Sequence, residues 1–315
     1  MSRAVDPGGR TPAALGIDVG GTKVALGVVT ADGRLLRSVR VDNRSATTAD
    51  GLLAMVASAA RDLAAAAGPG LAGVGIGMPE LVDLSGTIRT GSVVPWTNDD
   101  ILAALLGLGP VVIEADVRAA ALAESQFGAG AGYGAFCFLT IGTGVSCTMV
   151  RHGRPVRGAH GAAQLLGSGR VAVRCPACDA LADVSLEDLA SGPVLAARFG
   201  ERTGSRVREA EEIFAAAGHG DAAAREVLEQ AAHIAGSFLA MAVNLLDPEA
   251  VVVGGGLGSA GGVWWERLVA SARDHIWAPY VRGIPIVPAG LGPAAGVIGA
   301  GLCALTQFAG LSVEA

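Results

Sequence analysis

Three glycine-rich turns each follow a short apolar run. Residues 18–23 read Asp-Val-Gly-Gly-Thr-Lys, and the other two turns are Gly142-Thr143-Gly144 and Gly254-Gly255-Gly256. Glycine leaves the backbone N–H groups of a turn accessible, and several N–H groups aimed at one point bind phosphate. An ordinary tight connection explains any one of these turns alone. Three of them at strand ends together predict a nucleotide site.

The first turn carries the side chains that nucleotide chemistry uses. We expect Asp18 to hold Mg²⁺ through water, Thr22 to donate to phosphate and Lys23 to offset the negative charge. Lys23 is the only lysine among 23 basic residues, and the abundance of Ala and Gly is typical of a GC-rich genome. Such a genome replaces Lys with Arg wherever either serves, so Lys23 is expected where a compact charge is wanted, although chance also explains one residue.

A carboxylate stands between a strand pattern and a helix pattern. Asp116 follows the apolar run 111–114 and opens a helical pattern that continues to Phe127. A hydroxyl that attacks a γ-phosphate must be oriented in line and must lose its proton as the bond forms, and a carboxylate does both. Asp also often caps a helix at such a position. Beside three glycine turns, we interpret Asp116 as a general base.

The apolar periodicity predicts an α/β protein that positions these groups. The expected strands are 15–19, 24–29, 35–41, 74–78, 111–114, 135–141, 145–150, 250–253 and 284–287. The expected helices are 49–67, 116–127, 186–199, 207–217, 222–246, 264–277 and a last one from about Ala294. The order strand, glycine turn, strand occurs near residue 20 and again near residue 143, which indicates an internal duplication.

Composition narrows the class of protein. A chain of 315 residues with 51% hydrophobic and 17% charged residues is long enough for two compact domains. A net charge of -6 and the lack of a long apolar run argue against nucleic acid and membrane partners. Five cysteines without a dense even framework favour the cytoplasm.

The motifs resemble the ROK family of sugar kinases and repressors. The resemblance rests on the three turns, on Glu114-Ala115-Asp116 and on residues 251–256, and it covers about 13–305 in the family's order. It implies two ribonuclease-H-like lobes, as in actin and hexokinase, around a central cleft. It also implies ATP with Mg²⁺, a small sugar-like substrate and a homodimer. We expect a flexible tail at 1–12, an N-terminal lobe at 13–114 joined by a C-terminal helix at about 296–315, and a C-terminal lobe at 115–295.

The resemblance also implies a role for individual residues. Asp116 matches the catalytic aspartate, and Glu187 matches a glutamate beside the substrate. The phosphate residues would be Asp18, Gly20, Gly21, Thr22, Lys23, Gly142, Thr143 and Gly144. The adenosine residues would be Gly254, Gly255 and Gly256.

The sequence departs from the family where the sugar should bind. The family's Glu-Asn-Asp-Ala-Asn is Glu-Ala-Asp-Val-Arg at 114–118, and its Gly-Glu-x-Gly-His is Gln-Leu-Leu-Gly-Ser at 164–168. Glu80 follows Pro79 where the family has glycine, and it reads either as a new carboxylate at the substrate or as a solvated surface group. The loss of several hydroxyl ligands predicts a changed acceptor.

Two acceptor classes of antibiotic biosynthesis in GC-rich bacteria fit this change. One is an amino sugar, whose ammonium Glu80 could pair with. The other is a C7-cyclitol, which we favour because the ligands on the anomeric side are the most disturbed. An ordinary hexose kinase such as a glucokinase and a non-catalytic sugar sensor remain the alternatives.

The family's zinc site is incomplete in this sequence. Zinc needs four ligands, which are one His and three Cys in the family. Only Cys175 and Cys178 remain, because Ser168 and Ser185 stand where we place the missing His and Cys. His160 or Asp179 could substitute, but we expect a thiol pair without metal.

Two rival functions are disfavoured. Residues 256–261 fit a dinucleotide fingerprint, with Asp274 at a suitable distance for ribose, but no βαβ unit with a catalytic constellation accompanies them. A repressor would carry an N-terminal helix-turn-helix domain, for which we expect no room before the first strand at Leu15.

Overall fold

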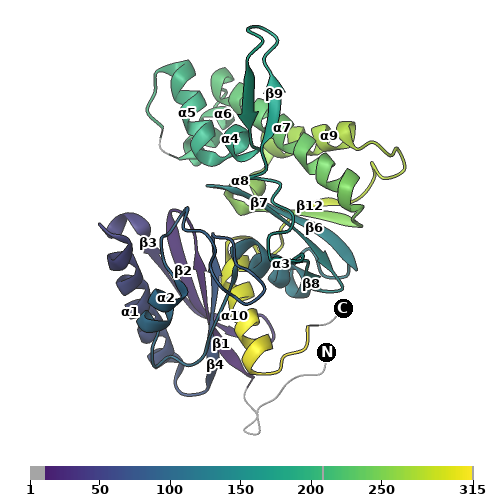
Figure 1. Ribbon diagram of the computed structural model, residues 1–315. Coiled ribbons are helices and arrows are strands. Elements are labelled where there is room, and N and C mark those ends of the chain that lie inside the picture. Colours follow the sequence, from purple (N-terminus) through teal and green to yellow (C-terminus); the bar gives the residue numbers. More distant parts are fainter. Residues whose placement is uncertain (1–10, 208, 314–315) are drawn as a thin grey trace. The chain divides into compact units, whose positions relative to one another are not determined.

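The computed structural model describes residues 11–207 and 209–313 (Figure 1). The predicted tail at 1–12 lies almost entirely outside this range.

The chain divides into two compact units. Unit 1 comprises the residues up to 134, residues 150–163 and those from 290, and unit 2 comprises 135–149 and 164–289. The structure combines helices with two five-stranded sheets, which confirms the predicted α/β class.

The sheet of unit 1 has the order β3-β2-β1-β4-β5. Its strands are β1 (Ala13–Val19), β2 (Lys23–Thr30), β3 (Leu35–Asp42), β4 (Leu71–Met78) and β5 (Val111–Ala115). Strand β1 is antiparallel to β2 and parallel to β4, and β4 is parallel to β5. The register places Asp18, Gly77 and Glu114 side by side across β1, β4 and β5. Because these three strands are parallel, their C-terminal ends meet at one edge of the sheet.

The helices of unit 1 are α1 (Ala49–Ala67), α2 (Asn98–Ala104), α3 (Asp116–Phe127) and α10 (Ala295–Phe308), with short 3-10 turns at η1 (Asn43–Ser45) and η2 (Gly292–Ala294). Glycines let the backbone of α10 lie directly on the sheet. A Cβ at Gly16 would lie 2.1 Å from the carbonyl oxygen of Val297, and one at Gly75 would lie 1.8 Å from that of Ala300. No residue with a side chain fits at either position.

The boundary of the first unit differs from the one predicted at residue 114. Helix α3 belongs to unit 1, together with the C-terminal helix α10. The reason is packing, because a Cβ at Gly299 of α10 would lie 1.8 Å from the carbonyl oxygen of Ala119 in α3. Buried Glu124 at the end of α3 also accepts hydrogen bonds from the N–H groups of Gly290 and Leu291, just before α10.

The other five-stranded sheet has the order β12-β11-β6-β7-β8. Its strands are β6 (Ala135–Ile141), β7 (Val145–Arg151), β8 (Arg154–Pro155), β11 (Ala250–Gly254) and β12 (Ile286–Pro288). Strand β11 is parallel to both β6 and β12. The helices of unit 2 are α4 (Glu187–Ala190), α5 (Gly192–Thr203), α6 (Ala210–Gly218), α7 (Ala222–Leu246), α8 (Gly255–Gly258) and α9 (Gly262–His275). Helices α7 and α9 pack closely, with Trp264 fully buried in the core of this unit.

Some elements differ from the sequence prediction. The helix expected at 186–199 is two helices, α4 and α5, which meet at Ser191 because Gly192-Pro193 begins a new helix and proline has no N–H to continue the old one. The hairpin of β9 (Val171–Arg174) and β10 (Leu181–Val184) was not predicted, and neither were α2 and β8. Within the described residues, no helix combines the length and the apolar character that a membrane span requires.

Candidate functional site

Two carboxylic acids of unit 1 lie on either side of Gly77. A Cβ built on Gly77 would be 3.6 Å from Oδ1 of Asp18 and 3.4 Å from Cα of Asp116. Asp18 is at the end of β1, and Asp116 is the first residue of α3, directly after β5. The predicted magnesium ligand and the predicted base therefore lie on either side of one small residue, and the charge of Asp18 acts on Asp116.

The surroundings of both acids favour their protonated forms. Burial, reinforced by the negative charge of Asp18, raises the pKa of Asp116 to about 7, against a hydrogen bond from the Val117 N–H and the charge of Arg118. Burial also raises the pKa of Asp18 to about 6, although Lys23 opposes it. A carboxyl with a pKa near neutrality suits general base catalysis at physiological pH.

Asp116 does not act as the helix cap that its position in the sequence allowed. Its Oδ1 accepts from the N–H of the next residue, Val117, at 2.6 Å. A capping side chain would accept from the second or third N–H of the helix. The N-cap position of α3 is Ala115, which makes no side-chain hydrogen bond.

Asp18 meets the requirement for a cation ligand. No described residue donates a hydrogen bond to its carboxylate, which lies against the first turn of α10, where a Cβ at Gly296 would be 2.3 Å from Cγ of Asp18. Mg²⁺ prefers carboxylate oxygens and keeps several of its waters. A partly buried carboxylate without donors therefore fits Mg²⁺ held through water.

The first glycine turn joins β1 and β2 and is fixed from one side. The Gly20 N–H donates to the carbonyl of Lys23 at 3.0 Å, and Nδ2 of Asn43 donates to the carbonyl of Gly20 at 2.9 Å. The Asn43 N–H donates to the carbonyl of Thr22 at 3.0 Å. Gly21, Thr22 and Lys23 are exposed and so remain accessible to a ligand. No sequence motif indicated Asn43, because β2 and β3 separate it in the sequence from the turn to which it donates a hydrogen bond.

The second and third turns adjoin each other in unit 2. Parallel pairing aligns Gly254 of β11 with Thr140 of β6, so both strands end at the same edge. A Cβ at Gly142 would lie 3.7 Å from the backbone nitrogen of Gly256. Gly255 has a φ of 84°, and a Cβ there would lie 2.2 Å from the carbonyl oxygen of Ile141, so only glycine fits. The geometry thus brings two of the predicted nucleotide motifs together.

Glu187 supports the second turn. Its Oε2 accepts from the N–H of Val145 at 3.0 Å, and a Cβ at Gly144 would lie 2.9 Å from the same oxygen. Sequence reasoning assigned Glu187 to substrate. Its hydrogen bond is with the backbone at the start of β7, directly after the second turn, which leaves Oε1 for a further ligand.

Glu80 is buried, contrary to the solvated alternative. Its two oxygens accept from the hydroxyl of Thr90 at 2.5 Å and from the N–H groups of Ser92, Val93 and Val94 at 3.0, 2.6 and 3.0 Å. Burial by itself raises the pKa of Glu80, but these hydrogen bonds outweigh it and lower the pKa. The carboxylate of Glu80 stabilises the loop 90–94 through these hydrogen bonds. The hypothesis that it pairs with a substrate ammonium therefore has no support in the structure.

A buried ion pair flanks Asp116. Arg118 donates to Oε1 of Glu114 at 2.7 Å and to the carbonyls of Gly161 and Val82 at 2.7 and 2.6 Å, and Arg157 pairs with the other oxygen of Glu114. The side chains of Glu114 and Arg118 are only 6% and 7% exposed. Arg118, which stands where the resemblance implies an asparagine, therefore fixes the strand–helix junction that carries Asp116.

No described cluster of three or more His, Cys, Asp or Glu side chains has the geometry to hold a metal ion. Cys175 and Cys178 lie between β9 and β10 without a third ligand of these types.

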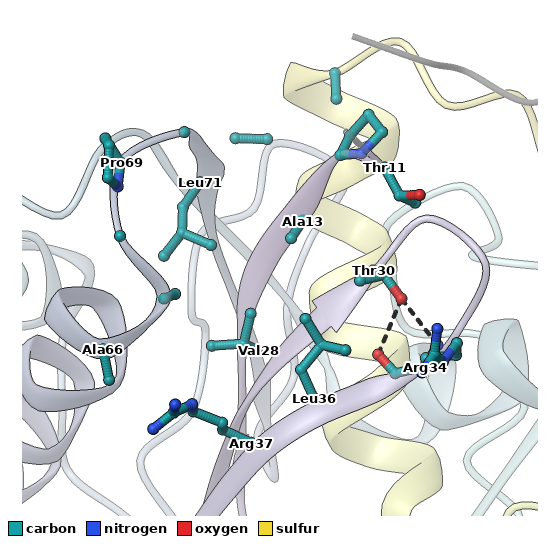
Figure 2. Close-up of a pocket in the computed structure, with 16 residues that line it drawn as sticks. Thr11, Ala13, Val28, Thr30, Arg34, Leu36, Arg37, Ala66, Pro69 and Leu71 are labelled. Carbon is teal, nitrogen blue, oxygen red and sulfur yellow. Dashed lines mark hydrogen bonds between the residues drawn. The ribbon is translucent and has the colours of Figure 1, made fainter. Parts of the chain in front are cut away.

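A pocket of about 880 Å³ in unit 1 lies away from the acids (Figure 2). It is lined by Ala13 at the start of β1, Leu71 at the start of β4, Arg34 after β2 and Pro69 after α1. Asp18 and Gly77 lie at the opposite ends of the same strands. The pocket is therefore separate from the candidate site.

The model of the ROK family matches residues 14–307. The chain belongs to the ROK family. It is 30% identical over 311 residues to the glucokinase of Streptomyces coelicolor, covering 91% of this chain and 95% of that one. It is 29% identical to the N-acetylmannosamine kinase of Shigella boydii, covering 92% and 97%. A crystal structure of a ROK family glucokinase from Streptomyces griseus with glucose and AMPPNP superimposes with a TM-score of 0.81 at 30% identity, covering 93% and 99%.

The raised pKa of Asp116 makes stability depend on pH. The folded protein holds this proton up to about pH 7, whereas the unfolded chain releases it near 3.8, so the contribution to stability is complete below about pH 4 and is lost as the pH rises through 7. Asp116→Asn keeps an acceptor for Val117 but carries no titrating proton. At about 1.4 kcal/mol per pKa unit, we expect the variant to be more stable than wild type by a few kcal/mol at pH 8 and equal to it near pH 4.

Thermal unfolding between pH 4 and 8.5 measures this difference. Asp62→Asn, on the exposed side of α1, is the matched control and should show no such trend. Parallel curves for wild type and Asp116→Asn at every pH would contradict the raised pKa.

Removing Arg118 should destabilise the protein strongly, because Glu114 and two carbonyls lose their buried partner. We expect Arg118→Ala to lower the free energy of unfolding by about 3 kcal/mol, and Arg118→Lys to recover part of it, since lysine restores the charge but not the forked donors. Arg225→Ala breaks an exposed pair with Glu229 and should cost about 0.5 kcal/mol or less. Urea denaturation compares the three, and equal losses for Arg118→Ala and Arg225→Ala would show that the buried pair has no structural role.

Proposed function

We propose that this chain is an ATP-dependent kinase that phosphorylates a hydroxyl of a sugar-like ring. It is a sugar kinase of the ROK family, and its full-length relatives bear the names of sugar kinases. The observation that carries the mechanism is the approach of Asp116 to Asp18 beside Gly77, with the pKa of Asp116 raised to about 7.

Asp116 is the general base in this proposal. Its carboxylate orients the acceptor hydroxyl and takes the proton as the oxygen attacks the γ-phosphorus. The fixed junction of β5 and α3, held by Arg118, limits the movement of the base. A base near neutrality accepts the proton readily and returns it to solvent after each turnover.

The glycine turns provide the nucleotide contacts. Thr22 and Lys23, together with the backbone of Gly20 and Gly21, would bind phosphate. Asp18 would hold Mg²⁺, which would neutralise charge on the phosphates. In unit 2, Gly142-Thr143-Gly144 bind phosphate and Gly254-Gly255-Gly256 approach the adenosine. The adjoining position of these two turns supports this assignment. The resemblance also supports a homodimer.

For the acceptor, we propose a C7-cyclitol in preference to an amino sugar. The internal hydrogen bonds of Glu80 remove the argument for an ammonium partner. Gln164 likewise accepts from the backbone N–H of Met149 at 2.6 Å, so this substitute in the family's sugar motif serves the protein itself. A hexose kinase is the second candidate, because the relatives include named glucokinases.

A coupled ADP-release assay with Mg·ATP tests the function. The panel comprises glucose, N-acetylmannosamine, glucosamine and a C7-cyclitol such as valienol. We expect turnover with a cyclitol to exceed that with the hexoses, and Asp116→Asn to lower kcat by orders of magnitude while ATP binding, followed by calorimetry, is retained.

Two outcomes have different meanings. Turnover with glucose alone would replace the cyclitol by the hexose alternative while leaving the kinase intact. Wild-type activity in Asp116→Asn, or no binding of ATP with Mg²⁺, would overturn the kinase mechanism itself.

A further inference from the structure

The turn between β9 and β10 holds two cysteines in a closed arrangement. The sequence at 175–178 is Cys-Pro-Ala-Cys. The Cys175 N–H donates to the carbonyl of Ala180 at 2.8 Å, and the Asp179 N–H donates back to the carbonyl of Cys175 at 2.9 Å. Asp179 adopts a left-handed φ of 61°, which lets the chain reverse. The strands on either side pair from Arg174 with Leu181 onward. The two thiols are therefore held in one turn.

This turn favours the thiolate of Cys175. The backbone of Cys178 and Ala177 and the thiol of Cys178 lower the pKa of Cys175 below the ordinary value. Donors to a sulfur stabilise the thiolate, which is the nucleophilic form of cysteine. The hydrogen bond from the Asp179 N–H to the carbonyl of Cys175 closes the backbone turn that contains both cysteines.

Exposure separates this pair from the other cysteines. Cys178 is exposed and Cys175 is partly exposed. Cys137 and Cys147 also contact each other, with 3.3 Å between their sulfurs, but both are buried. A hydrogen bond with Cys137, together with burial, raises the pKa of Cys147, which disfavours its thiolate. Only the turn between β9 and β10 combines neighbouring thiols, donors and access to solvent among the described cysteines.

We propose that Cys175 and Cys178 form a redox-active dithiol that exchanges with small-molecule disulfides such as glutathione disulfide. Neither the kinase activity nor a metal is needed for this chemistry. Two thiols supply half of the four ligands that a structural zinc requires, and the described residues add no third ligand of the usual types. Cys-X-X-Cys turns in reducing compartments serve transient redox reactions.

The exchange proceeds in two balanced steps. The Cys175 thiolate attacks one sulfur of the small disulfide, forms a mixed disulfide and expels one small thiolate. Cys178 then loses its proton to solvent and attacks the sulfur of Cys175, which forms the intrachain disulfide and expels the second thiolate. The protein loses two electrons and two protons, and the small disulfide becomes two thiols. Excess small thiol reverses both steps.

Equilibration in buffers of graded glutathione to glutathione disulfide ratio tests the proposal. Samples are quenched with acid, alkylated and mapped by peptide mass spectrometry, which distinguishes this pair from Cys137, Cys147 and Cys303. We expect a reversible Cys175–Cys178 disulfide with a single midpoint. In Cys178→Ser the mixed disulfide should accumulate at Cys175, because the resolving thiol is gone. In the matched variant Cys175→Ser, glutathione should add to Cys178 at least tenfold more slowly.

Three results would overturn the proposal. The pair could stay reduced in glutathione disulfide alone, or glutathione could add to both single variants at the same rate. The third is one equivalent of zinc in the purified protein that is released only when the thiols are modified, as measured with a metal-sensitive dye. None of these results bears on sugar phosphorylation, so the two proposals fail independently.

Discussion

The interaction between two neighbouring carboxylic acids, Asp18 and Asp116, is the constraint on which the candidate site depends. Asp18 and Asp116 lie on either side of Gly77 in the β1-β4-β5 register, close enough for the charge of Asp18 to act on Asp116. Like charges in a partly buried place repel, so at least one acid tends to hold a proton near neutral pH. Glycines also let α10 lie directly on the sheet. Its first turn, at Gly296, packs against the carboxylate of Asp18.

Around this pair, the residues that depart from the family have become internal supports. Arg118 and Glu80 hold backbone segments through several hydrogen bonds each, and Gln164 binds β7. A polar side chain that satisfies the backbone is no longer available to a sugar hydroxyl. The three glycine turns keep the residues on which the family resemblance rests, so the departures lie outside these turns.

The elements that could be predicted from the sequence are those whose signals lie within their own segment. Helices 49–67, 116–127 and 222–246 were predicted with the bounds that the structure has, because periodicity and end signals lie within each segment. The backbone contacts of Glu80, Glu187 and Asn43 were not predicted, since each binds groups that only the folded chain brings near. The hairpin β9–β10 was missed because its strands are short and largely exposed, without an apolar alternation.

The central claim is that Asp116, whose pKa is raised to about 7, takes a proton from the acceptor hydroxyl. Measuring kcat/KM for the acceptor from pH 5 to 9, at saturating Mg·ATP, tests it most directly because this ratio reports the ionising groups of the enzyme–Mg·ATP complex that binds the acceptor. The account predicts a tenfold rise per pH unit on the acid side and a plateau above about pH 7. A profile that is flat across this range would contradict it.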